Sequence, residues 1–259
     1  FEPIESLLFK MDRNNVKKAA LIQHRGYFDN TYLFDCCKKY PSRFVACCLV
    51  DTYSDNKLSD KEAREKLEEL KKKGAKGIRV YMVFLPTIES GFFKKCEELE
   101  LVISFQGGVE FFSGSQFEEI VALHPKLRII LEHGCGAHYT TVTHGIIQPP
   151  YTQFKKIMKL AKRYNNIYAK VPGLGEFSKR PVVLTNEYRV EDTPPLIEMM
   201  YEAFGPKRLM YGSDHPLVSS RGGYHNALQG ILNYPFFEDK QDELEWIMGK
   251  TANALWGFS

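Results

Sequence analysis

The sequence predicts an α/β protein, a (β/α)8 TIM-type barrel whose first strand is missing from the sequence given. Short apolar runs alternate with amphipathic stretches along the whole chain, as in a parallel sheet covered by helices. Seven such strand-helix units follow one leading helix. A doubly wound sheet is the main alternative, but its Gly-x-Gly-x-x-Gly turn after a first strand is absent. No Pro-, Gly- or Ser-rich linker divides the chain, so we expect residues 1–259 to form one barrel domain.

The strands are predicted where apolar residues run for about four to eight positions between turn signals. Phe44–Asp51, with the sequence FVACCLVD, has a composition suited to a buried sheet. In chain order the predicted strands are Ala19–His24, Phe44–Asp51, Gly77–Met82, Leu101–Gln106, Leu127–His133, Ile167–Val171 and Arg208–Gly212.

The helices are predicted from apolar spacing and from capping residues. The helix Ser59–Lys73 has the clearest ends, because Ser59 can cap its first turn, Glu62 follows three residues on, and Gly74 lies just past its last turn. The other predicted helices are Ile4–Met11, Asn30–Lys39, Ser90–Leu99, Ser115–Leu123, Tyr151–Tyr164, Pro195–Phe204, Tyr224–Leu232 and Glu243–Trp256.

The composition is that of a soluble globular protein, with 44% apolar and 26% charged residues. No apolar run approaches the roughly 20 residues of a membrane helix. A net charge of +3, with lysines beside glutamates on the helices, argues against nucleic-acid binding. The six cysteines lack disulfide or Cys-x-x-Cys zinc spacing, and no signal-like segment opens the chain. We therefore expect a reducing compartment and a cytoplasmic location.

Two residues at the ends of predicted strands are the main catalytic candidates, because barrel active sites lie at the carboxyl ends of the strands. Asp214 lies in a Gly-Ser-Asp-His-Pro turn and suits a general base that activates water. His133 ends its strand and could hold a metal or donate a hydrogen bond to a carbonyl oxygen. Either residue alone could be structural, but together at two strand ends they predict a catalytic site.

Further polar residues are candidates for substrate binding. Arg79 lies inside an apolar strand, and its guanidinium suits a substrate carboxylate; the alternative is an internal ion pair with a barrel acid. Three arginines in the loops after the last two strands could bind further carboxylates or be surface residues: Arg180, Arg189 and Arg221. The other predicted site residues are His24, Tyr81, Gln106 and His215.

The chain resembles the amidohydrolase-related (amidohydrolase 2) family of metal-dependent hydrolases, and within it the 2-pyrone-4,6-dicarboxylate lactonase branch. The resemblance runs from about Ile4 to the C-terminus. It is carried by the segments AFGPKRLMYGSDHP at 203–216, TANALWG at 251–257, YPSRFV at 40–45 and GIR at 77–79, and by the strand ending at His133.

Family members usually have a His-x-His first strand, a histidine at the end of strands five and six, and an aspartate at strand eight. By this match His133 takes the strand-six role and Asp214 the strand-eight role. The chain departs from the pattern in having no His-x-His and in having Gln106 at the strand-five position. Because glutamine removes a good imidazole ligand, a firmly bound divalent metal is less expected.

The resemblance implies a hydrolase that opens a small carboxylated lactone or cyclic ester without a cofactor. Asp214 would activate water, His133 would polarise the carbonyl, and His215 replaces the aromatic residue common after the aspartate. One alternative is a metal-dependent amidohydrolase or non-oxidative decarboxylase, with a divalent metal such as zinc at His133 and Asp214. The other is a non-catalytic barrel used for binding or assembly.

The expected partner is a small carboxylated substrate, and we expect neither nucleic-acid nor membrane binding. The sequence leaves open whether the chain forms a homo-oligomer. A barrel without one strand would expose two unpaired edges, which is hazardous for a soluble protein. We therefore expect a strand from upstream residues, or less readily from a partner, to close it.

Overall fold

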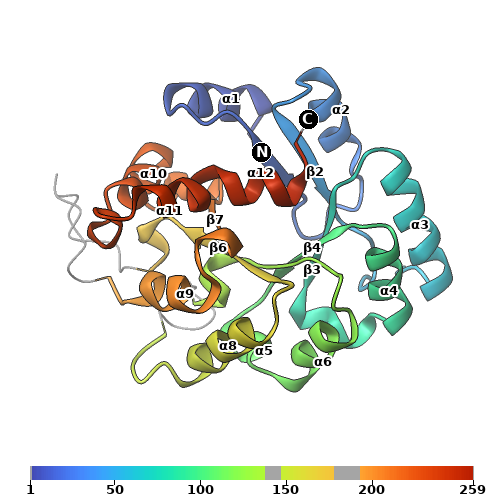
Figure 1. Ribbon diagram of the computed structural model, residues 1–259. Coiled ribbons are helices and arrows are strands. Elements are labelled where there is room, and N and C mark those ends of the chain that lie inside the picture. Colours follow the sequence, from blue (N-terminus) through green and yellow to red (C-terminus); the bar gives the residue numbers. More distant parts are fainter. Residues whose placement is uncertain (1, 138–146, 178–192, 259) are drawn as a thin grey trace.

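A computed structural model describes residues 2–137, 147–177 and 193–258. Within them, seven parallel strands form one curled sheet whose order follows the chain (Figure 1). The strands are β1 (Ala19–Ile22), β2 (Phe44–Cys48), β3 (Gly77–Tyr81), β4 (Val102–Gln106), β5 (Ile129–Leu131), β6 (Ile167–Pro172) and β7 (Leu209–Gly212). Every predicted strand is thus confirmed, and the fold is the expected TIM-type α/β barrel with β1 and β7 as the edge strands of the described sheet.

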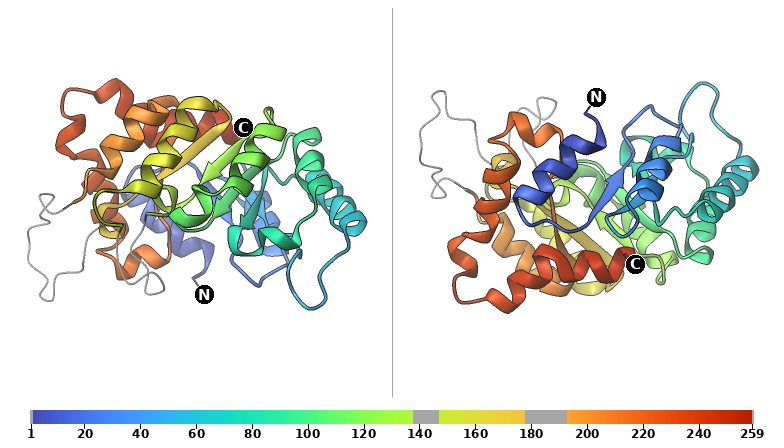
Figure 2. Two further views of the ribbon diagram at one scale, coloured as in Figure 1. Left: turned by 90° about the horizontal axis from the view of Figure 1, so that it is seen from below. Right: turned by 90° about the horizontal axis from the view of Figure 1, so that it is seen from above.

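Helices surround this sheet on its outer side, as Figures 1 and 2 show. The longer helices are α1 (Ile4–Arg13), α2 (Thr31–Lys39), α3 (Asp60–Lys72), α4 (Ser90–Glu98), α6 (Ser115–Leu123), α8 (Thr152–Arg163), α9 (Leu196–Phe204) and α10 (Tyr224–Leu232). The predicted capping box is present, because the Ser59 side chain accepts from the Glu62 backbone N–H and the Glu62 side chain accepts from the Ser59 N–H.

The last predicted helix is divided into three consecutive parts. It consists of α11 (Gln241–Glu245), a π-helical turn at Trp246–Lys250 and α12 (Thr251–Trp256). Leu255 and Trp256 pack with a buried set of strand residues that includes Val45, Cys47, Val102, Ile130 and Met210. Because these residues lie on β2, β4, β5 and β7, the C-terminal helix joins strands that are distant in the sequence.

Short helical turns that were not predicted lie in the connections between the longer elements. They are η1 (Met82–Thr87), α5 (Val109–Phe112), α7 (His133–Gly136), η2 (Leu174–Glu176), η4 (Pro206–Arg208), η5 (Leu217–Ser220) and η6 (Pro235–Phe237). Two of them begin the loops that carry site residues, since α7 follows β5 and η2 follows β6.

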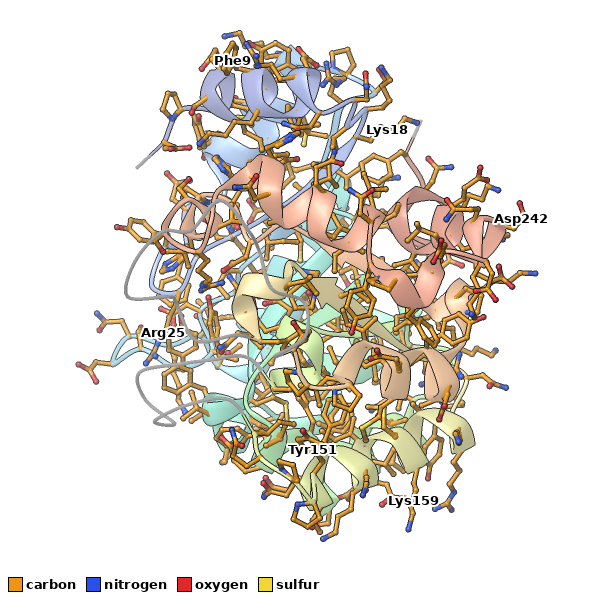
Figure 3. All side chains as sticks on the ribbon, turned by 90° about the vertical axis from the view of Figure 1, so that its left-hand side faces the viewer. Phe9, Lys18, Arg25, Tyr151, Lys159 and Asp242 are labelled. Atoms are coloured by element: carbon orange, nitrogen blue, oxygen red, sulfur yellow. The ribbon has the colours of Figure 1, made fainter. Side chains whose placement is uncertain are left out.

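The outer surface carries the charged faces of the helices. Figure 3 shows Lys159 on α8 and Asp242 on α11 pointing away from the core, together with Phe9 on α1. Among the described residues, no helix is both long and apolar enough to cross a membrane.

Candidate active site

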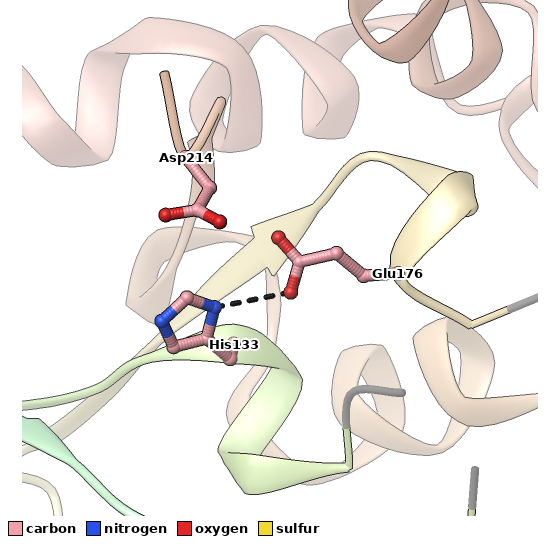
Figure 4. A group of neighbouring side chains, drawn as sticks. All are labelled: His133, Glu176 and Asp214. Atoms are coloured by element: carbon pink, nitrogen blue, oxygen red, sulfur yellow. Dashed lines mark hydrogen bonds and ion pairs between the residues drawn. The ribbon is translucent and has the colours of Figure 1, made fainter. Parts of the chain in front are cut away.

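Three ionisable side chains meet at the carboxyl ends of consecutive strands (Figure 4). His133 follows β5, Glu176 ends the turn after β6, and Asp214 follows β7. One nitrogen or oxygen atom from each lies within 4.8 Å of the other two. The predicted pair of His133 and Asp214 is therefore brought together, and a buried glutamate is added to it.

The backbone is strained at both predicted residues. His133 and Asp214 each have a φ of 52°, in the left-handed region that residues with side chains seldom adopt. Such conformations cost of order 1–3 kcal/mol and cluster at functional sites. This turn ends β5 at Leu131, before the predicted end at His133, and the strand also begins later than predicted, at Ile129 instead of Leu127.

An arginine joins the two carboxylates of the group. The Nη1 atom of Arg221 lies 2.8 Å from Oε1 of Glu176 and 2.8 Å from Oδ2 of Asp214. On its other side, Oε2 of Glu176 lies 3.1 Å from Nδ1 of His133. With His133 protonated, two cations balance two carboxylates.

Burial and charge together shift the acid–base properties of the pair. Burial raises the pKa of Asp214 above its usual value, and this outweighs the opposing attraction of His133 and Arg221. For His133, burial alone would lower the pKa, but Glu176 and then Asp214 and Glu132 reverse this, so the pKa is raised. A carboxylate with a raised pKa is a better base, and a stabilised imidazolium is a better hydrogen-bond donor.

A second charge network lies next to His133, inside the barrel. Glu132 accepts from Arg79 Nη2 at 2.6 Å, from Lys170 Nζ at 2.9 Å and from Ser104 Oγ at 2.7 Å. Burial alone would raise the pKa of Glu132, but Arg79 and Lys170 hold it well below its usual range. Oε2 of Glu132 also lies 3.8 Å from Nε2 of His133, so the two networks adjoin.

For Arg79 the structure shows the internal ion pair that the sequence left as the alternative to binding a substrate carboxylate. Its guanidinium also lies 4.9 Å from the ring centroid of Tyr81, whose phenol is buried with a pKa raised to about 12 by that burial. The Arg79 Nε atom is buried and has no hydrogen-bond partner among the described residues.

The other predicted residues are not members of the group formed by His133, Glu176 and Asp214. His24 is exposed after β1, and its Nδ1 lies 3.3 Å from the Arg25 carbonyl oxygen. Gln106 ends β4 and is half-buried. His215 Nε2 lies 2.8 Å from Oε2 of Glu2. Arg180 and Arg189 lie outside the described residues.

Sequence reasoning missed Glu176. Its one signal is an acidic residue within Val171–Phe177 (VPGLGEF), a segment otherwise made of apolar residues, proline and glycine. Such a residue is expensive to bury unless it is paired, and Glu176 is paired with both His133 and Arg221.

A divalent metal bound by His133 and Asp214 is the alternative that the sequence leaves open, and Glu176 would be its third ligand. One imidazole and two carboxylates are a ligand set that zinc accepts. However, Arg221 places a positive charge 2.8 Å from both carboxylates, where the metal would compete with it. As arranged, the site therefore does not fit a firmly bound divalent metal.

A family model described as amidohydrolase matches residues 2–258. The chain belongs to the amidohydrolase family. It is accordingly an enzyme of the hydrolase type, as predicted, and the resemblance drawn from the strand-end residues is confirmed. No curated protein sequence matches the chain.

Solved structures show the same fold at low sequence identity. A probable 2-pyrone-4,6-dicarboxylic acid hydrolase from Acinetobacter baumannii, with citric acid bound, has a TM-score of 0.73 at 16% identity, over 100% of this chain and 92% of that chain. An amidohydrolase from Burkholderia multivorans with bound zinc has a TM-score of 0.75 at 16% identity, over 100% and 89%. The 5-carboxyvanillate decarboxylase of Sphingomonas paucimobilis has a TM-score of 0.65 at 13% identity, over 100% and 84%.

Proposed function

We propose that this amidohydrolase-family chain opens a small carboxylated lactone or cyclic ester by hydrolysis without a bound metal. The observation that carries the proposal is that Asp214, which is half-buried at the end of β7, lies close to His133, which Glu176 contacts at the end of β5. Arg221 lies between the carboxylates of Asp214 and Glu176. An ester carbonyl needs an activated water and a positive group near its oxygen, and these residues supply both.

Asp214 would act as the general base. Its Oδ2 atom is held by Arg221, so the carboxylate keeps a fixed orientation while Oδ1 takes the proton from the attacking water. The raised pKa of Asp214 favours this proton transfer. After the ring opens, the same proton passes to the leaving oxygen, and the aspartate returns to its ionised form.

His133 would polarise the carbonyl. Glu176 lies against Nδ1, which orients the ring and stabilises the imidazolium. Nε2, on the opposite side of the ring, would donate to the carbonyl oxygen and then to the oxyanion of the tetrahedral intermediate. Hydrogen bonds of this type strengthen as negative charge develops, so they lower the barrier rather than only binding the substrate.

Carboxylate groups on the substrate would bind to the barrel arginines. We assign this role to the loop residues Arg180 and Arg189, because the Arg79 guanidinium already binds Glu132. His24, Tyr81, Gln106 and His215 would line the remaining mouth. The citric acid in the Acinetobacter baumannii structure supports a preference for small polycarboxylates.

The test is hydrolysis of a lactone panel, with metal content measured on the same preparation. We expect ring opening of 2-pyrone-4,6-dicarboxylate or another carboxylated lactone, slower opening of neutral lactones, and no loss of activity with chelator. Stoichiometric metal with chelator-sensitive activity would favour the metal-dependent hydrolase. Release of CO2 from an aromatic carboxylic acid would favour the decarboxylase. No turnover with any of these would contradict the proposal.

A further inference from the structure

Arg221 connects two strand ends through a single nitrogen atom. Nη1 lies 2.8 Å from Glu176, which follows β6, and 2.8 Å from Asp214, which follows β7. About one-fifth of the Arg221 side chain is exposed, while Glu176 is almost fully enclosed. A bridge between two carboxylates from neighbouring loops is the contact that a divalent cation commonly makes in a hydrolase site.

The turn that carries Arg221 is fixed to the loop of Asp214. The Val218 N–H donates to the Asp214 carbonyl oxygen at 3.0 Å, and the Arg221 N–H donates to the Val218 carbonyl oxygen at 2.9 Å. Val218 is buried in a cluster with residues of α1 and α10. These backbone hydrogen bonds fix the turn from which the Arg221 side chain extends. The guanidinium therefore lies between the two carboxylates and does not extend into solvent.

The charges show why a cation is needed there. One oxygen of Glu176 and one of Asp214 lie within 4.8 Å of the same His133 nitrogen, and the negative charge of Glu176 raises the cost of ionising Asp214. A guanidinium offsets this repulsion, stays charged at every physiological pH and cannot ligate water as a metal does. It would keep Asp214 ionised and available as a base.

The geometry points to Arg221 as a built-in cation that takes the place of a divalent metal between Glu176 and Asp214. Removing its guanidinium converts His133, Glu176 and Asp214 into a metal-binding site. This inference extends the proposed metal-free hydrolysis at the same site, but its test uses no substrate. A chain that opens no lactone can still show the metal-binding gain, so failure of the function and failure of the inference are separate results.

The experiment compares Zn²⁺ binding by the chelator-stripped wild type and the Arg221→Gln variant, using calorimetry. We expect the variant to bind one Zn²⁺ per chain with a Kd at least tenfold lower than that of the wild type. Co²⁺ would then give the visible absorption of a low-coordinate site in the variant and not in the wild type. Adding Glu176→Gln to the variant should abolish both gains, which locates the metal.

Arg163→Gln is the matched control, because Arg163 pairs with Glu118 on the exposed surface. It removes the same charge and should bind Zn²⁺ as the wild type does. Arg221→Lys returns a positive charge between the carboxylates and should therefore bind Zn²⁺ as weakly as the wild type does. If Arg221→Gln does not fold, as judged by circular dichroism, Arg221→Met replaces it. A folded variant without the gain, or a wild type that binds one Zn²⁺ as tightly as the variant, overturns the inference.

Discussion

The Nδ1 atom of His133 lies 3.1 Å from Oε2 of Glu176, in a part of the barrel mouth where both side chains are largely enclosed. Burial without a partner would leave the imidazole neutral, whereas the carboxylate raises its pKa. The carboxylate thereby favours the cationic form of the histidine close to Asp214. This relationship determines the pH range in which the proposed chemistry can operate.

Replacing Glu176 by glutamine should move the alkaline limb of the pH profile. The folded-state pKa of His133 is raised, so the imidazolium is present below the ordinary value of 6.5 and is lost as the pH rises through the raised pKa. Glu176→Gln removes the largest raising contribution, so we expect the alkaline limb of kcat/KM to move to lower pH.

The contribution of the His133–Glu176 pair to the free energy of unfolding should likewise be lost as the pH rises. Glu176→Gln should lower the free energy of unfolding more at pH 6 than at pH 9, because only the protonated histidine gains from the carboxylate. Glu98→Gln, on the exposed side of α4, is the control and should change neither profile. An unchanged alkaline limb in Glu176→Gln would show that His133 is not the titrating group.

Replacing Asp214 by asparagine should remove the general base. We expect kcat for lactone opening to fall by about 10²- to 10⁴-fold, while KM changes little because the amide keeps a similar shape. Steady-state kinetics measure both constants. Asp239→Asn is the control, since Asp239 is 82% exposed and pairs only with its neighbour Lys240 among the described residues. A kcat within threefold of the wild type would exclude Asp214 as the base.

Replacing Glu132 by glutamine should destabilise the barrel. The change leaves the cations of Arg79 and Lys170 without their buried carboxylate, and breaking such a pair costs about 3–5 kcal/mol. Glu118→Gln breaks a surface pair instead and should cost less than about 1 kcal/mol. Urea unfolding at pH 7 measures both changes.

The acid dependence of this pair has the opposite sign to that of His133. Because the folded-state pKa of Glu132 is lowered, its contribution to stability is present above the ordinary value of 4.5 and is lost as the pH falls through the lowered pKa. The difference in the free energy of unfolding between Glu132→Gln and the wild type should therefore become smaller only in strong acid. Equal costs for Glu132→Gln and Glu118→Gln at pH 7 would refute a buried network.

Most of the strands could be predicted because they are largely buried, although all four residues of β1 are only half-buried. All five residues of β2 are buried, so the segment shows as a continuous apolar run. His133 and Asp214 were found because parallel strands bring their carboxyl ends to one edge. The boundary at β5 was missed, since the left-handed turn at His133 is a property of the folded loop and leaves no periodic signal.

Partnerships across the sheet were less predictable. The sequence indicated that Arg79 needs an anion, but it could not choose between a substrate and Glu132. That choice depends on the register, in which Arg79 pairs with Ser104 and Ser104 with Ile130, so that Glu132 lies within reach of Arg79. Glu176 lies in a short 3-10 turn and Arg221 directly follows another. In such turns neither apolar spacing nor capping residues indicate which way a side chain points.

Replacing Gly134 by alanine should disturb His133 through the backbone. Gly134 has a φ of 56°, and an added Cβ would lie 2.4 Å from the Cζ atom of the fully buried Phe177. Gly134 directly follows His133 and Phe177 directly follows Glu176, so relief of this clash should disturb the positions of the two paired side chains. We expect a loss of about 1–3 kcal/mol in the free energy of unfolding, together with a lower kcat.

Gly249→Ala is the matched control for this change. It lies in the π-helical turn of the C-terminal segment, and an added Cβ there would meet no atom within 4 Å. Alanine in a helix should leave stability unchanged or raise it by up to about 1 kcal/mol. Thermal unfolding and lactone kinetics of the two variants compare the positions directly. If Gly134→Ala matched Gly249→Ala in both stability and kcat, the turn at His133 would tolerate a change of conformation. The strained backbone would then not be what holds the histidine in place.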